Sequence, residues 1–310
     1  MKGFLIAIGD FSSNGTIQIY DESSTLVTSF KAHENQINHI KQLPNGFVAT
    51  ASSDSRCKIW NLTNLTLIQT YTGHIDEVYG LEYINSYTMA SGALSPDMTI
   101  KIWSIFTGST NLTIHTGSGV ISLKLLSNGF YLACGLVYHI INIYNINTGS
   151  LITNLVGHLN TINDMVLISN DLLASSSGDS SVRIWNLSTN TNKYNMTSHK
   201  NSVYGLKLIS SDILASGSSD KTVKLWNITS GTLLRTLYNH TSAIVWSVDL
   251  LNDGQTLVSG SQDQTIKLWY FNTGQIWKTI NTGLKIRSMA VLNSRIGNSF
   301  NTNTKAAFYF

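Results

Sequence analysis

The chain has 310 residues, a formal net charge of +3, and charged residues at only 12% of its positions. This weak charge argues against a strongly basic nucleic-acid surface, and no apolar run is long enough to cross a bilayer. Cys57 and Cys134 occupy different points of two repeats, which argues against a disulfide framework. We therefore expect a soluble intracellular protein, cytoplasmic or alternatively nuclear.

The first elements are two strand-like segments, residues 4–9 and 16–20, and a repeat follows them. Histidines recur at steps of 41, 41, 43, 41 and 41 residues, namely His33, His74, His115, His158, His199 and His240. A second series ends short apolar runs at the same step: Tyr20, Trp60, Trp103, Tyr144, Trp185, Trp226 and Trp269. Units of 40 to 45 residues with several strand-like segments predict an all-β propeller, here with seven blades.

One unit shows the pattern of a blade. Alternating apolar residues predict strands over 203–208, 213–217, 222–226 and 232–237, and short polar turns separate them. Each unit is therefore expected to form a four-stranded antiparallel meander.

The last predicted strand, residues 286–292, has the pattern of an innermost strand, which the blade containing Tyr20 lacks. If this strand joins residues 4–9 and 16–20, the ring closes and no long sheet edge is left open. We expect one domain over residues 1–292 and a polar tail over 293–310.

The repeats resemble the WD-repeat family. The resemblance is carried by Thr72-Gly73-His74 with residues 96–103, which end at Trp103, and by Val156-Gly157-His158 with residues 178–185, which end at Trp185. It covers nearly the whole chain. It implies a closed seven-bladed ring around a central channel, with the innermost strand of each blade following the histidine.

The resemblance also implies a hydrogen-bonded set inside each regular blade. The sets are His33, Thr50, Asp54 and Trp60; His74, Ser91, Asp97 and Trp103; His158, Ser175, Asp179 and Trp185; His199, Ser216, Asp220 and Trp226; and His240, Ser259, Asp263 and Trp269. Two blades depart from the pattern: the first has Asn14 and Tyr20, and the fourth has Cys134, Tyr138 and Tyr144 and is expected to keep only its histidine.

These polar sets are interpreted as structural. An acid–base site is not built in five copies, and histidines in separate blades cannot meet at one metal ion. No phosphate-binding loop or paired-histidine metalloprotease motif is present. We therefore expect no enzyme activity, cofactor or metal.

Residues that differ between blades are the candidate binding site. In WD-repeat proteins, residues about three and five after the histidine commonly contact partners on the narrow face of the ring. The later set is Asn38, Tyr79, Ile121, Asn163, Tyr204, Trp246 and Arg287, and Glu77, Ser202, Ile244 and Lys285 lie beside it. Tyr, Trp and Arg are enriched at binding hot spots. The alternative is that some of these rings only pack against neighbouring blades.

The expected function is a non-catalytic scaffold or adaptor that binds one or more proteins or peptides through the narrow face. A unit this generic also occurs in longer chains and multiprotein complexes, and either context fits. The alternative is a reader of a non-protein or modified ligand, nucleic acid or a modified peptide. Nucleic acid is disfavoured because several basic residues are expected at solvated outer positions: Lys58, Lys101, Arg183, Lys224 and Lys267.

Overall fold

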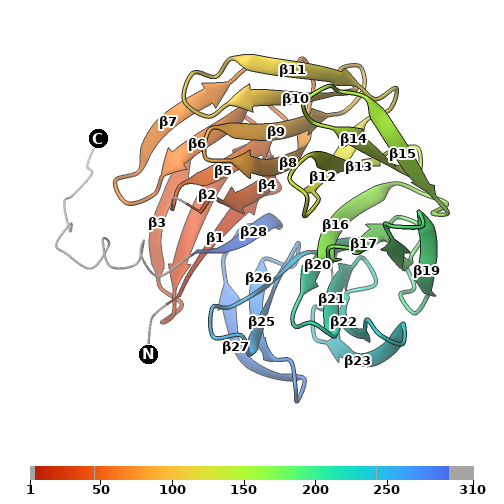
Figure 1. Cartoon of the computed structure of the whole chain (residues 1–310). Helices are drawn as coiled ribbons and strands as arrows, with labels where there is room; N and C mark the ends of the chain where they lie inside the picture. The colour runs from red at the N-terminus through yellow and green to blue at the C-terminus, as the bar shows by residue number, and fades with distance from the viewer. Residues whose placement is uncertain (1–3, 45, 242, 293–310) are drawn as a thin grey trace.

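The computed structural model describes residues 4–44, 46–241 and 243–292. The regular structure in these ranges consists of 28 β-strands in seven antiparallel sheets of four. Figure 1 shows the sheets arranged around a common axis as the blades of a ring. The predicted all-β, seven-bladed propeller is confirmed.

The innermost strand of each blade borders the central channel. These strands are β4 (Ile37–Gln42), β8 (Val78–Asn85), β12 (Val120–Leu125), β16 (Ile162–Ser169), β20 (Val203–Leu208), β24 (Val245–Leu250) and β28 (Ile286–Leu292). The second strands are β1 (Leu5–Asp10), β5 (Val48–Ser52), β9 (Thr88–Ala93), β13 (Tyr131–Leu136), β17 (Leu172–Ser177), β21 (Ile213–Ser218) and β25 (Thr256–Ser261).

The third strands are β2 (Thr16–Asp21), β6 (Cys57–Asn61), β10 (Thr99–Ser104), β14 (Ile140–Asn145), β18 (Val182–Asn186), β22 (Thr222–Asn227) and β26 (Thr265–Tyr270). The outermost strands are β3 (Leu26–Lys31), β7 (Thr66–Tyr71), β11 (Thr110–His115), β15 (Leu151–Val156), β19 (Thr191–Met196), β23 (Thr232–Tyr238) and β27 (Gln275–Asn281). Exposure rises outward: β5 is buried throughout, whereas most of β23 is exposed.

The core lies between adjacent blades. Small and apolar side chains fill the second strands because both faces of each sheet are covered by neighbouring blades. One cluster joins Val223 and Leu225 of β22 to Val245 and Val248 of β24 in the next blade. Such contacts remove apolar surface from water on both sides of every blade and so hold the ring together.

The ring closes as predicted. Strand β28 pairs antiparallel with β1, with Leu292 opposite Leu5 and Ala290 opposite Ala7, and Figure 1 shows the blue β28 beside the red β1. The blade β28-β1-β2-β3 therefore unites the two ends of the described chain. The predicted tail, residues 293–310, lies outside the described residues.

Every innermost strand contains one break in its pairing register near its start. In β4, Ile37 and His39 pair with consecutive residues of β5 and Asn38 is left over. The unpaired residues are Asn38, Tyr79, Ile121, Asn163, Tyr204 with Gly205, Trp246 and Arg287. An extra residue of this kind, a β-bulge, redirects its side chain. The seven candidate contact positions therefore coincide with the bulges.

Candidate functional site

The polar sets of the regular blades are hydrogen-bonded chains. In the blade β20–β23, His199 Nδ1 lies 2.7 Å from Asp220 Oδ2, and His199 Nε2 lies 2.7 Å from Ser216 Oγ. The Trp226 indole N–H donates to the same hydroxyl over 2.8 Å. Each set therefore ties the loop before the innermost strand to the second and third strands.

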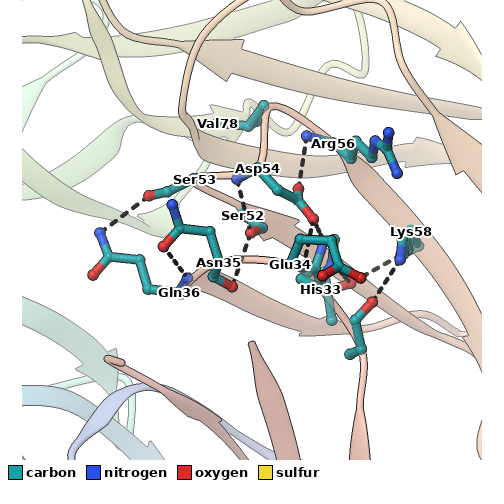
Figure 2. A network of polar contacts seen from close by, with 12 residues as sticks. His33, Glu34, Asn35, Gln36, Ser52, Ser53, Asp54, Arg56, Lys58 and Val78 are labelled. Carbon is teal, nitrogen blue, oxygen red and sulfur yellow. Dashed lines mark hydrogen bonds and ion pairs between the residues drawn. The ribbon is translucent and has the colours of Figure 1, made fainter. Parts of the chain in front are cut away.

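Figure 2 shows two members of the corresponding set, His33 and Asp54, with the polar residues around them. His33 Nδ1 lies 2.9 Å from Asp54 Oδ2, and Asp54 accepts the backbone N–H groups of Glu34 and Arg56, each over 3.0 Å. The His158 and His240 sets repeat the histidine–aspartate, histidine–serine and tryptophan–serine contacts of the His199 set. His74 differs: its Nε2 meets Ser91 Oγ at 2.8 Å, but its Nδ1 lies 3.2 Å from Asp97 without a hydrogen bond.

Burial favours the neutral form of three of these imidazoles. Burial lowers the pKa of His33, His158 and His199, and the nearby carboxylates only partly oppose that shift. Burial alone would raise the pKa of Asp220, but hydrogen bonds from His199, Thr222 and the Lys200 backbone, together with the electrostatic effect of His199, outweigh it and the net pKa is lowered. Both imidazole nitrogens of His199 are hydrogen-bonded and its side chain is fully buried. Neither ring nitrogen of His199 is therefore free to act as a base on a substrate.

The prediction that His115 belongs to the series of buried histidines is wrong. His115 is exposed at the end of β11 and does not occupy the buried position. Cys57 pairs with Tyr71, three residues before His74, and the equivalent Ile100 pairs with Ile114, three residues before Gly117. Gly117 is therefore the true counterpart of the buried histidines, and this blade lacks the entire set.

The basic residues before the terminal tryptophans are a second correction. Lys224 and Lys267 are buried rather than solvated, and the other three are half-buried. The Lys224 ammonium donates to Thr236 Oγ1 over 2.9 Å, and that of Lys58 donates to the Ala32 carbonyl over 2.6 Å. Their alkyl stems pack against the blade while the charged ends reach polar atoms of neighbouring strands and loops.

At the narrow face, the end of the ring where the innermost strands begin, three aromatic rings surround one cation and a fourth ring packs on one of them. Arg287 Cζ lies 3.7 Å from the ring centroid of Trp246, 5.4 Å from that of Tyr79 and 5.6 Å from that of Phe11. Tyr204 contacts Trp246 at 4.1 Å between centroids. We call these five residues the Arg287 cluster. All five are half-buried, so the rings pack together yet remain partly open to solvent.

Bulges and one glycine bring the Arg287 cluster together. A Cβ at Gly205 would lie 2.8 Å from the Trp246 carbonyl oxygen, so the bare backbone allows β20 and β24 to approach closely beside Tyr204. Phe11, which the sequence interpretation missed, follows β1 and donates its backbone N–H to the Lys285 carbonyl over 2.8 Å. Ser53 and Ser219 make the equivalent bond in their blades, so aligning that turn across the repeats would have found Phe11.

The other candidate residues separate into two groups. Glu77 and Lys285 lie beside the Arg287 cluster: Glu77 accepts the Tyr79 hydroxyl over 3.1 Å, and Lys285 is exposed just before β28. Asn38 and Asn163 instead connect blades, because their amides donate to the Val78 and Val203 carbonyls over 3.0 and 2.7 Å.

A cavity of about 510 Å³ continues from the Arg287 cluster into the channel, lined by residues of the innermost strands. Most of its charged groups form ion pairs: Glu82 Oε2 lies 2.5 Å from Lys41 Nζ, Glu82 Oε1 lies 3.3 Å from Lys124 Nζ, and Lys207 Nζ lies 2.5 Å from Asp249 Oδ1. Asp164 accepts the Leu206 backbone N–H over 2.8 Å, and burial raises its pKa to about 6.

Within the described ranges, no three His, Cys, Asp or Glu side chains gather in a way that could hold a metal ion. A search of the same residues for a helix able to span a membrane finds none.

Comparison with known proteins agrees with this geometry. Residues 11–270 match the model of a family described as the IFT122 first β-propeller. Protein tipD of Dictyostelium discoideum is 32% identical over 130 residues, covering 40% of this chain and 21% of that protein. The WD repeat-containing protein 89 homolog of the same organism is 30% identical over 138 residues, covering 40% of this chain and 37% of that protein.

The matched segments are therefore well under two thirds of these relatives' lengths. Among solved structures, the computationally designed Ika8 protein superposes with a TM-score of 0.70 over 90% of this chain and 85% of its own, at 24% identity. That likeness supports the fold alone.

Proposed function

Because the chain belongs to the WD-repeat β-propeller family, we propose that it is a non-catalytic scaffold that binds a protein or peptide through the narrow face. The Arg287 cluster is the observation that carries this proposal. Aromatic and arginine side chains dominate the binding energy of protein interfaces. Here they meet at the mouth of the channel on bulged positions, where a side chain can change without altering the strand pairing around it.

The polar sets support a scaffold rather than an enzyme. Each buried imidazole of a regular blade is hydrogen-bonded to side chains of its own blade, as His199 is to Ser216 and Asp220. This arrangement stiffens the loops that present the narrow face and supplies no unengaged nucleophile or base.

The test is affinity capture followed by measurement with the purified partner. Trp246→Ala should weaken partner binding by at least about 30-fold, which corresponds to about 2 kcal/mol at an interface hot spot. Trp277→Ala is the matched control, because Trp277 is an exposed tryptophan on the outermost strand β27. Unchanged affinity for Trp246→Ala with a lower melting temperature would assign Trp246 to packing only.

The proposed compartment is the cytoplasm, with the nucleus as the alternative. Two buried free cysteines, Cys57 and Cys134, fit a reducing environment. Imaging a fluorescent fusion in cells tests this assignment.

A further inference from the structure

We infer that the segment bound at the Arg287 cluster is an acidic peptide whose oxyanion, from Asp, Glu or a phosphorylated side chain, meets the edge of the Arg287 guanidinium. The inference rests on the proposed function and names the chemical class of its partner.

Arg287 lacks a counter-ion in the described part of the molecule, where no Asp or Glu carboxylate oxygen lies within 4.0 Å of its guanidinium nitrogens. The Trp246 ring takes the flat face of the guanidinium and the neutral Tyr79 hydroxyl interacts with its edge, so no carboxylate neutralises the charge. Glu77 attracts the cation, but its carboxylate is engaged with the Tyr79 hydroxyl. Burial lowers the pKa of Arg287, so the charge is held at a cost that an oxyanion would offset.

A second donor lies in the same cluster. The Trp246 indole Nε1 is buried and has no hydrogen-bond partner within the described residues. A buried N–H without an acceptor is costly, and such groups are few in folded proteins. The cluster therefore presents an excess of donors over acceptors, which suits a ligand rich in acceptor oxygens.

Channel acids below the cluster do not supply the missing acceptors. Glu82 is held by Lys41 and Lys124, and Asp249 by Lys207. Asp164 accepts the Leu206 backbone N–H instead of facing a cation at ion-pair distance. The acidic side chains of the cavity are thus committed to the ring itself.

Charges around the cluster favour an acidic partner on one side. Lys200 precedes β20, Lys221 lies in the turn before β22, and Lys285 precedes β28, and all three are exposed. None forms an ion pair within the described ranges. The acids Asp76 and Glu77 lie at the start of β8, on the Tyr79 side. An acidic segment would therefore run over the starts of β20, β24 and β28, where opposite charges attract it.

A cationic ligand is the competing occupant, because aromatic rings also bind ammonium groups. Arg287 already occupies the faces that such a ligand would need, and it would repel a second cation. The charge of the bound peptide therefore decides between the two.

A random dodecapeptide display library, selected against the whole folded chain, tests the inference. We expect the selected peptides to be enriched in Asp and Glu. Synthetic labelled versions, measured by fluorescence anisotropy, should bind Arg287→Met at least about 30-fold more weakly. Arg287→Lys should be intermediate because it keeps the charge and loses the planar fork. Peptides with Asn and Gln in place of Asp and Glu should bind both proteins weakly, and phosphoserine versions would show which oxyanion is preferred.

A second variant guards against misfolding of Arg287→Met. The triple change of Lys200, Lys221 and Lys285 to Ser alters exposed side chains only, and it should lower affinity several-fold and flatten its salt dependence. Selection of basic or uncharged peptides, or no selection of peptides at all, would overturn the inference. So would Arg287 and lysine variants that bind the acidic peptides as tightly as the unmodified protein does. Binding of the captured protein partner that still depends on Trp246 would leave the proposed function standing.

Discussion

The regular blade β20–β23 and the irregular blade β12–β15 have the same strand order, although only one contains the polar set. In β21 and β22, Ile213 to Gly217 pair with Asn227 to Val223, and in β13 and β14, Tyr131 to Gly135 pair with Asn145 to Ile141. Cys134 is buried in the position equivalent to Ser216, and its thiol makes no hydrogen bond within the described residues. The backbone ladder and apolar packing therefore suffice to form a blade.

The irregular blade lacks the hydrogen bonds that anchor the loop before its innermost strand. Tyr144, in the tryptophan position, hydrogen-bonds Asn142 of its own strand over 2.9 Å. Tyr138, in the aspartate position, is exposed. In the regular blade, Asp220 also accepts the Lys200 backbone N–H over 3.0 Å, which fixes the loop before β20. The polar set thus anchors the narrow-face loops more than it builds the sheet.

The largest difference between the two blades is expected from Asp220→Ala. The substitution leaves buried His199 and the Lys200 backbone N–H without an acceptor, so it should cost about 1–3 kcal/mol of unfolding free energy. Asp212→Ala, in an exposed turn of the same blade, should stay within about 0.5 kcal/mol. Urea denaturation compares them, and equal midpoints would contradict an anchoring role.

A hydroxyl should be tolerated in one blade and not in the other. Cys134→Ser places a polar group in a buried position that has no imidazole or indole partner, and should cost about 1–2 kcal/mol. Conversely, Ser216→Ala removes the partner of His199 and Trp226 and should destabilise by a similar amount. If Cys134→Ser leaves the unfolding free energy unchanged in denaturant titrations, the irregular blade contains a hydrogen-bond partner for a hydroxyl at this position.

Acid should weaken the regular blades through their histidines. Burial lowers the pKa of His199 below its ordinary 6.5, so between these two values the unfolded chain binds more protons than the folded chain. The contribution of neutral His199 to the free energy of unfolding is therefore fully present above pH 6.5, and it declines as the pH falls toward the folded-state pKa. Asp220, with a lowered pKa, adds a further loss below its ordinary 3.8.

Asp164 changes stability with pH in the opposite direction to the histidines, because its pKa is raised from 3.8 to about 6. Its protonation favours the folded state as the pH falls through about 6, and it partly offsets the histidines. Asp164→Asn should therefore steepen the loss of stability between pH 7 and pH 4 in denaturation curves. An unchanged pH dependence in this variant would show that folding does not raise the pKa of Asp164.

The smallest effect should come from His115→Ala. His115 is exposed at the end of β11, outside any polar set, so its removal should change the unfolding free energy by less than about 0.5 kcal/mol. The same substitution at His199 should cost several times more. Equal effects at the two positions would restore His115 to the buried series.

Repetition made the fold predictable, since a pattern present in most blades identifies strands that no single segment would. The prediction of the buried histidine positions was wrong where the length of a repeat changed. Ser91 and Asp97 are six positions apart, against four for Ser216 and Asp220, so the next buried position moves from residue 115 to Gly117. A histidine at the unshifted interval concealed this change. The burial of Lys224 also escaped prediction, because it depends on neighbouring strands and not on local alternation.

The candidate site was predictable in part for a related reason. Tyr79, Tyr204, Trp246 and Arg287 share one repeat position, so the offset from the histidine identified them together. Phe11 occupies a different position, in the turn after β1, and reaches Trp246 only because the ring is closed. Period-two alternation also gives no sign of the bulges, since an extra residue breaks that alternation without changing the composition.

The pairing of β28 with β1 has a consequence for synthesis of the protein. Leu5 and Leu292 are opposite one another, so β1 to β3 leave the ribosome long before the strand that completes their sheet. Blades β4–β7 through β24–β27 are each made of consecutive strands and can assemble as they emerge. Strand β1 must therefore keep an open edge available, shielded by chaperones or by neighbouring blades, until residues 286–292 arrive.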